Sequence, residues 1–300
     1  MERSEALGNK AFFTEDEIRA MIAGEKEIDP VTGNITVPVA GANVGAYGAE
    51  WLDMGGAVLS TGQTSLIVDP PNGRAPIRDS TWESRQYDLD HLEDNYIHHT
   101  VWDRCITRGV PGSMLPAAYN NAYSIVQTPD HIAIMHEMIH EVRIISLNKT
   151  DHIDDKVKLW MGDSVAHWEG ETLVVETKNF NGNTMIANSG GGGRLRGLPS
   201  GEGQHLVERF TRISEDTIIW EVRITSPRSF TQPITISMPL TRDPDYTLYE
   251  YACHEGNHAL GNISVLAVNA KHAKQRAFNG VLYVPQARDV IEAIDAASAH

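Results

Sequence analysis

The stretch IAIMHEMIHEVRIISL, residues 132–147, decides which fold the chain adopts. Within it, residues 136–140 read HEMIH and match the pattern H-E-x-x-H. On a helix, this pattern places two imidazoles one turn apart, with a glutamate as general base beside a zinc ion. The preceding residues 128–130, TPD, can start such a helix. They suit the tight turn of a β-hairpin equally well, so the flanking residues leave both structures open.

The composition of the stretch favours strands, because it is rich in Ile and Val. One face of a strand would carry Ile132, Ile134, His136, Met138 and His140. Glu137 would then point to the other face, away from both imidazoles. A zinc protease of the metzincin type also needs glycine three residues after the second histidine, where Arg143 stands. We therefore predict strands here rather than a zinc-binding helix.

A zinc-dependent hydrolase is nevertheless one alternative. It would bind the metal through His136 and His140, and the third ligand would come from His167, His254 or His258. Neither Cys105 nor Cys253 belongs to a C-x-x-C pair, so no cysteine-based metal site is indicated. The short histidine pattern alone is a weak signal.

Bulk composition narrows the classes of partner. The 300 residues carry a formal net charge of −15, and the short run around Arg194 and Arg196 is the main basic cluster. Nucleic acids and anionic membranes both need clustered Lys and Arg, so neither is expected as a partner. No apolar run approaches the length of a membrane span. No Gly-rich phosphate loop or dinucleotide fingerprint occurs, and we expect no cofactor.

Localisation is predicted from the N-terminus and the cysteines. The first 17 residues, MERSEALGNKAFFTEDE, are charged and lack the apolar core of a signal peptide. Two cysteines in 300 residues are typical of free thiols in a reducing compartment, although a single disulfide is the other reading. We therefore expect a cytoplasmic protein, either monomeric or a homo-oligomer.

The middle of the chain reads as a series of short strands separated by turn residues. Strands at such regular spacing indicate an antiparallel meander, either a barrel or a strongly curved sheet, and of the two we predict a barrel of the lipocalin type. The segments are YSIVQT (123–128), IAIMHEM (132–138), EVRIISL (141–147), SVAHWEG (164–170), ETLVVETKNF (171–180), HLVERFTRI (205–213), TIIWEVRIT (217–225), ITISMPLTR (234–242) and LYEYACHE (248–255).

The remaining segments are expected to flank this barrel within a single domain, residues 1–300. Residues 1–120 supply N-terminal helices at 14–27 and 81–103, an extended wrap over 28–80, and a loop at 108–116. The barrel core covers 121–260, and residues 188–203, NSGGGGRLRGLPSGEG, interrupt it as a disordered loop or a lid. Helices at 261–278 and 286–298 end the domain.

Many ionisable residues stand among apolar ones in the strand segments. For any one of them an outward-facing charge is the simpler explanation. Alternation, however, places Glu208 with Leu206 and Phe210, and Glu250 and His254 with Ala252. If that face lines a cavity, burial and mutual charge would shift the pKa values, as general acid–base catalysis requires. The candidate catalytic residues are His140, Glu137, Arg143, His167, Glu208, Glu250, Tyr251 and His254.

Several motifs together resemble a largely uncharacterised bacterial family that is common in sphingomonads and soil bacteria. The resemblance covers roughly residues 45–266. Its motifs are TSLIVDPPNGRAP, RGVPGSMLP, YSIVQTPDHIAIMHEMIHEVRII, WMGDSVAHWEGETLVVETKNF, HLVERFTRI and LYEYACHEGNHALGNI. In that family the position of His136 is often not histidine, whereas those of Glu137, His140 and Arg143 are more constant. The resemblance therefore implies that the zinc-like pattern is accidental.

The resemblance also implies an activity, by similarity to phenylcoumaran γ-formaldehyde lyase of lignin-dimer breakdown. We expect a cofactor-independent lyase acting on a small aromatic substrate. In this scheme His140 or His254 is the base, a glutamate is its partner or the acid, Arg143 binds a substrate oxygen and Tyr251 binds a phenol. A third hypothesis is a non-catalytic binding protein with a lipocalin-like pocket.

Overall fold

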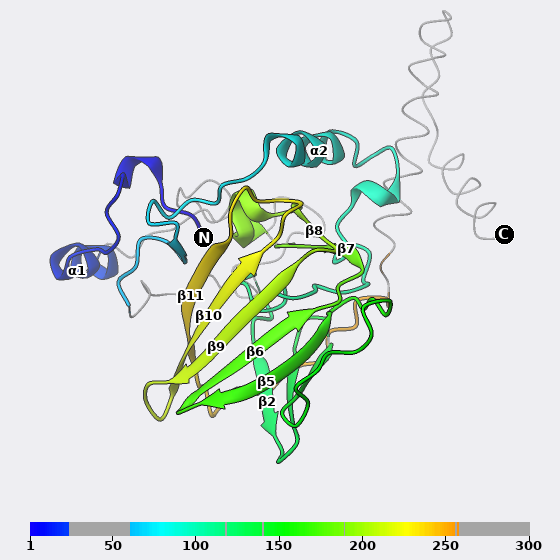
Figure 1. Cartoon of the computed structure of the whole chain (residues 1–300). Helices are drawn as coiled ribbons and strands as arrows, with labels where there is room; N and C mark the ends of the chain where they lie inside the picture. The colour runs from blue at the N-terminus through cyan, green and yellow to red at the C-terminus, as the bar shows by residue number, and fades with distance from the viewer. Residues whose placement is uncertain (24–60, 118, 140, 189, 256, 258–300) are drawn as a thin grey trace, which may run out of the picture.

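The computed structural model describes residues 1–23, 61–117, 119–139, 141–188, 190–255 and 257 (Figure 1). Its largest element is a nine-stranded sheet in the order β1-β11-β10-β9-β6-β5-β4-β3-β2. The strands are β1 (Ile67–Asp69), β2 (Tyr123–Gln127), β3 (His131–His136), β4 (Val142–Ser146), β5 (Asp163–Glu169), β6 (Thr172–Lys178), β9 (His205–Arg212), β10 (Thr217–Thr225) and β11 (Ile234–Thr241). The prediction of a mainly β chain is therefore confirmed.

The stretch that opened the sequence analysis forms strands, not a helix. β3 ends at His136, and its burial alternates as predicted, with Ile132, Ile134 and His136 buried and Met135 exposed. The chain then turns and returns as β4, which pairs with β3 in antiparallel register. The predicted alternation stops at this turn, where Glu137 is buried as well. Residues 136–139 of the H-E-x-x-H pattern thus do not lie on a helix.

The sheet is mixed and, within the described residues, open. β4 and β5 run parallel, because the chain between Ser146 and Asp163 crosses back to the edge of the sheet at which β4 begins. All other neighbouring pairs are antiparallel. β1 and β2 stand at opposite ends of the strand order, so this part of the chain contains no closed barrel of the predicted kind. Figure 1 shows the strand direction turning across the sheet from β11 to β5, as sheet twist requires.

One face of the sheet carries the core. Alternate residues along β6, β9, β10 and β11 share this face, and their apolar side chains are buried together. The core includes Val175, Leu206, Trp220, Val222, Ile224, Ile236 and Met238. The loop of residues 107–115 belongs to it as well, through Val110, Met114 and Leu115. A loop buried to this extent is unusual, since connections normally run over the surface.

The first predicted helix begins where expected, and the second is shorter than the sequence predicts. α1 (Glu15–Ala23) begins at the expected capping box, in which the Glu17 amide donates to the Thr14 hydroxyl and Glu17 accepts from the Thr14 amide. α2 (Asp79–Asp90) ends 13 residues before the predicted boundary at residue 103. Beyond it, Asn95 accepts from the Ile97 amide and caps a short 3₁₀ turn, η3 (Tyr96–His98). Such a side-chain bond competes with continued helix. A further 3₁₀ turn, η1, covers Glu5–Leu7.

The glycine-rich segment is ordered structure rather than a disordered loop. It contains the 3₁₀ element η4 (Gly190–Leu195) and the strand β8 (Pro199–Gly201), which pairs with β7 (Gly182–Met185). Leu195 and Leu198 are fully buried and belong to the core. These two leucines anchor a segment whose glycine content suggested mobility.

The segment LYEYACHE (248–255) forms no strand, which corrects the prediction. Side-chain contacts hold it instead, and they include a disulfide between Cys105 and Cys253. The alternation used to align Glu250 with His254 therefore does not apply. The disulfide contradicts the expectation of free thiols and removes the cysteine argument for a reducing compartment. The predicted cytoplasmic location stays a prediction.

Two parts of the prediction fall outside the described residues. They are residues 24–60, which hold the end of the predicted helix 14–27 and most of the N-terminal wrap, and the C-terminal helices at 261–278 and 286–298. None of the described helices is long and apolar enough to cross a membrane.

Candidate functional site

The structure brings Arg143 and Glu208 together in the core of the sheet. The guanidinium nitrogen Nη1 of Arg143 donates to Oε1 of Glu208 at 3.0 Å, and Nη2 contacts Oε2. Nε donates to the hydroxyl of Ser164 at 3.1 Å, and Nη2 also donates to Thr177 at 2.7 Å. The indole of Trp220 donates to Glu208 at 3.1 Å. Each nitrogen of Arg143 thus has a partner.

This first group, the Arg143 cluster, comprises Arg143, Ser164, Thr177, Glu208 and Trp220. It spans five strands, β4, β5, β6, β9 and β10. The side chains of Arg143 and Glu208 are 2% and 0% exposed. Because the pair is saturated and closed to solvent, its geometry favours a structural role, joining the parallel end of the sheet to its antiparallel part.

A second buried arginine, Arg108, has a different environment. It lies in the buried loop of residues 107–115 and is 2% exposed. Its one protein partner in the described chain is the carbonyl oxygen of Leu115, at 2.9 Å from Nη2, while Nε is buried without a partner. No described carboxylate forms an ion pair with it. A buried cation without a counter-charge is costly unless something else neutralises it.

Three tyrosines lie near this guanidinium. Burial lowers the pKa of Arg108, and Tyr123, Tyr119 and Tyr251 lie near enough to act in the opposite direction. The hydroxyls of Tyr119 and Tyr251 are 3.4 Å apart, and Trp102 packs beside Tyr119 with ring centroids 6.4 Å apart. Tyr119, Tyr251 and Trp102 are half-buried. We call this group of three half-buried aromatic side chains near the buried cation the aromatic rim.

His136 lies behind this rim at the end of β3. Its Nε2 is 3.3 Å from the hydroxyl of Ser113, and its ring meets that of Tyr123 edge to face. Burial lowers the pKa of His136 to about 3, helped by the charges of Arg143 and Arg108. The imidazole is therefore neutral at pH 7. Its Nδ1 is buried and has no partner among the described residues.

Tyr123 is the third polar group at the base of the site. Its hydroxyl donates to the carbonyl oxygen of Met114 at 3.0 Å. Burial raises the pKa of Tyr123 to about 12, so the phenol stays protonated at neutral pH. We call Trp102, Arg108, Ser113, Tyr119, Tyr123, His136 and Tyr251 the Arg108 cluster. At pH 7 it combines one buried positive charge with neutral hydrogen-bonding groups.

Glu137 holds residues 246–255, which we call the tail, next to this cluster. Its two carboxylate oxygens each accept from the hydroxyl of Tyr246 at 2.9 Å, and Oε1 also accepts from the Tyr249 amide at 3.0 Å. The Cys105–Cys253 disulfide fixes the same tail a few residues later. Glu137 and Tyr251, two of the predicted catalytic residues, are thereby brought to the same region. Glu137 acts there as a clamp on the tail.

The other candidates do not join this group. His167 is on the outward face of β5, where Nε2 lies 3.2 Å from the exposed Glu169. Glu250 and His254 are exposed on the tail. His140, which with His254 was one of the two predicted bases, lies outside the described residues, as does His258. Their catalytic roles stay predictions.

The described part of the chain contains no group of three or more His, Cys, Asp or Glu side chains that could hold a metal ion. The zinc hypothesis named His140 and His258, and both fall outside this part. What the structure corrects is the helix on which the H-E-x-x-H geometry depends.

Sequence reasoning missed Arg108, Tyr119 and Tyr123. RGVPGSMLP was predicted to be a loop, and loops normally expose their arginines. One signal was present: the segment has a single charged residue among Val, Met, Leu, Gly and Pro. A loop of that composition is apolar enough to be buried.

Comparison with known proteins adds no relative. No protein-family model matches the chain, no curated protein matches it, and no solved structure matches it.

Proposed function

We propose that this chain is a cofactor-independent acid–base lyase that acts on a small phenolic compound at the Arg108 cluster. The observation that carries the proposal is the buried guanidinium of Arg108, which lies near three tyrosines and has no described carboxylate partner. A site of this kind is complementary to an oxyanion on a bound molecule. Such prearranged charge in a dry site is a large source of catalysis when negative charge develops on an oxygen.

A phenylcoumaran-type dimer would use this environment at two points. Removal of its phenolic proton opens the benzylic C–O bond and gives a quinone methide and an aryloxide. Removal of the hydroxyl proton of the hydroxymethyl arm then breaks the C–C bond that joins the hydroxymethyl carbon to the rest of the molecule. The electron pair returns to the quinone methide and restores the phenolate, and the arm leaves as formaldehyde. The products are a stilbene and formaldehyde, so the reaction needs no oxidant or reductant.

In this proposal each group has a role that its environment supports. Arg108 stabilises the phenolate or alkoxide oxygen, and Tyr119 and Tyr251 hold the aromatic ring at the rim. His136 is a poor base because its pKa is about 3, so it contributes a neutral hydrogen bond with Ser113. The base is then one of the two histidines predicted for this role, His140 or His254. Glu137 is a positioning residue that secures the tail carrying Tyr251.

The test is formaldehyde release from a phenylcoumaran-type dimer by the purified untagged protein, with elemental analysis of the same sample. We expect release without stoichiometric metal. Arg108→Gln should lower kcat/KM by roughly 100-fold to 1,000-fold, the range seen when one oxyanion-stabilising donor is removed. Arg209→Gln is the control, because Arg209 is an exposed arginine of β9 paired with Glu169. It should leave kcat/KM unchanged.

Three results would decide against the proposal. Release that survives Arg108→Gln would place the chemistry elsewhere. Stoichiometric zinc, with activity lost on chelation, would instead support the metal-dependent hydrolase. Binding of the dimer without formaldehyde would leave a non-catalytic binding protein.

A further inference from the structure

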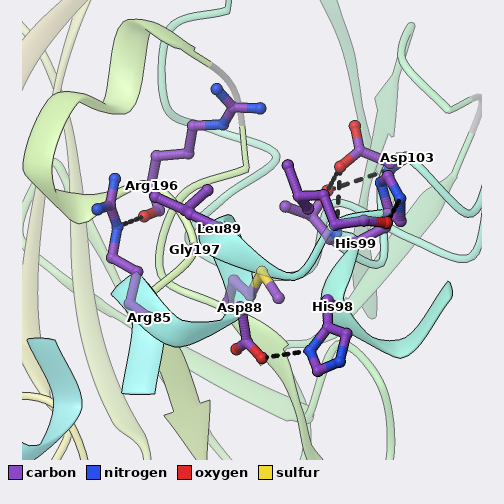
Figure 2. Close-up of a pocket in the computed structure, with 11 residues that line it drawn as sticks. Arg85, Asp88, Leu89, His98, His99, Asp103, Arg196 and Gly197 are labelled. Atoms are coloured by element: carbon purple, nitrogen blue, oxygen red, sulfur yellow. Dashed lines mark hydrogen bonds and ion pairs between the residues drawn. The ribbon is translucent and has the colours of Figure 1, made fainter. Parts of the chain in front are cut away.

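A second site lies on the α2 side of the molecule, and none of its lining residues belongs to the Arg108 cluster. It is a cavity of about 150 Å³ between α2, the chain that follows α2, and the segment joining η4 to β8 (Figure 2). Figure 2 shows Arg85, Arg196 and Gly197 on one side and His98, His99 and Asp103 on the other. Leu89, Leu92 and Met185 add apolar surface.

The arginine side has positive charge without described counter-charge. Arg196 forms no ion pair within the described residues, and its Nε is buried without a partner. Nε of Arg85 donates to the carbonyl oxygen of Arg196, which fixes the two residues together. Arg194 lies near them and stacks over Trp82 at 5.4 Å, as Arg85 does at 4.8 Å.

These cations act on one another. Burial lowers the pKa of Arg85, and the charges of Arg196 and Arg194 lower it further. The chain has a net charge of −15, so it contains more carboxylates than cations and could supply partners for all three arginines. Only Arg194 takes one in the described structure, Glu2 at 3.2 Å. An anion bound beside Arg196 would relieve the mutual repulsion and supply the missing partner.

The opposite side offers a different recognition chemistry. Nδ1 of His98 is 2.8 Å from a carboxylate oxygen of Asp88. This pair can form a hydrogen bond with a hydroxyl group of a ligand. Asp103 is occupied by the amide and hydroxyl of Thr100, at 3.1 Å and 2.8 Å. Two carboxylates on this side repel a multiply charged phosphate. They tolerate a ligand whose single negative charge lies at the far, arginine end.

The volume limits the size of the ligand. A protein cavity of about 150 Å³ accommodates one benzene ring. The apolar side chains of Leu89, Leu92 and Met185 suit such a ring, with polar groups at its two ends. The geometry points to a binding site for a single-ring hydroxycarboxylate, with its carboxylate on Arg196 and Arg85 and its hydroxyl on the His98–Asp88 pair. This site is separate from the one proposed for the lyase.

Calorimetric titration of the full chain with 4-hydroxybenzoate at low salt tests the inference. We expect binding to the wild type, weaker binding of benzoate, and none of benzyl alcohol, which lacks the carboxylate. Arg196→Gln should weaken binding by roughly 10-fold to 100-fold, as expected for a hydrogen bond to a charged group. Arg194→Gln is the matched control, because Arg194 belongs to the same cluster but is paired with Glu2 and does not line the cavity. It should change binding by less than about threefold.

Arg196→Lys guards against a folding defect in the glutamine variant. It keeps the charge and removes the planar fork, so intermediate affinity is expected. The inference fails if 4-hydroxybenzoate does not bind the wild type, or if Arg196→Gln and Arg194→Gln weaken binding equally. It also fails if inorganic phosphate binds more tightly than 4-hydroxybenzoate, because the site would then select multiple charge rather than a carboxylate.

Discussion

Two buried arginines in this molecule have opposite environments. Arg143 lies on β4 and is saturated by Glu208, Ser164 and Thr177. Arg108 lies in an apolar loop, and its one partner in the described chain is a backbone carbonyl. Both side chains are almost completely inaccessible. Burial alone therefore does not distinguish a structural arginine from a functional one, whereas the presence of a counter-charge does.

The difference follows from where each residue stands. Strand register fixes the position of Arg143 relative to Ser164, Thr177 and Glu208, so three strands other than its own supply these partners. The loop around Arg108 has no such neighbours and offers tyrosine hydroxyls instead. A saturated arginine has little capacity left for a ligand. An arginine among neutral donors keeps its charge available.

The largest effect is expected from breaking the Arg143–Glu208 pair. Glu208→Gln leaves the guanidinium without its buried counter-charge, and removal of one partner of such a pair destabilises by roughly 3–5 kcal/mol. Urea unfolding at pH 7 measures this loss. The double variant Arg143→Met, Glu208→Leu should recover most of it, since apolar replacement of a whole buried pair is often neutral. If Glu208→Gln changes the free energy of unfolding by less than about 1 kcal/mol, Arg143 is not the structural member of the comparison.

The sequence predicts that Glu208 lies on a buried strand face, but it does not predict that Glu208 and Arg143 come into contact. Alternation correctly placed Glu208 with Leu206 and Phe210 on a buried face. Nothing in the sequence states that β4 runs parallel to β5, and this neighbouring pair is what places Arg143 beside Ser164. Strand composition and turn residues located eight of the nine predicted strand segments. They failed for LYEYACHE, which is held by a disulfide and by hydrogen bonds to the Glu137 carboxylate instead of by hydrogen bonds to a neighbouring strand.

The Arg108 cluster could not be assembled from sequence. Its members come from the segments around residues 102–123, from the end of β3 and from the tail at Tyr251, and no periodic pattern connects them. The order of the glycine-rich segment was missed for a similar reason. Its glycines predicted mobility, whereas Leu195 and Leu198 fix it in the core through contacts far away in sequence.

The second-largest effect is the pH dependence of the free energy of unfolding that His136 causes. Because its pKa in the folded state, about 3, lies below the ordinary value near 6.5, folding disfavours the protonated form. This contribution to stability is fully present above pH 6.5 and is lost as the pH falls towards 3. At pH 5 the wild type should have lost about 2 kcal/mol relative to pH 7.5 through this residue.

His136→Gln isolates that contribution, because the variant cannot be protonated at this position. Urea unfolding of both proteins at pH 7.5 and pH 5 gives the difference in slope. Equal acid sensitivity of wild type and variant would mean that His136 is protonated in the folded protein. It would then carry charge beside Arg108 and no longer be a neutral partner.

A smaller effect on stability is expected at Arg108 itself. Arg108→Met removes a buried charge that has no counter-ion among the described residues, and it takes away the donor to the Leu115 carbonyl. The two consequences oppose each other, so the free energy of unfolding should change by no more than about 1 kcal/mol. Urea unfolding beside Glu208→Gln makes the comparison direct. A loss of 3–5 kcal/mol would show that Arg108 is as structural as Arg143.

The smallest effect is expected at His167, a predicted catalytic residue that lies in neither cluster. Its side chain is 65% exposed and its one described ion pair is with Glu169, which Arg209 also contacts. Exposed pairs of this kind contribute little, so His167→Ala should change the free energy of unfolding by less than about 0.5 kcal/mol. Formaldehyde release should also stay at the wild-type rate. If His167→Ala abolished turnover while Arg108→Gln did not, catalysis would lie on the outward face of β5, and the unpaired charge of Arg108 would need another explanation.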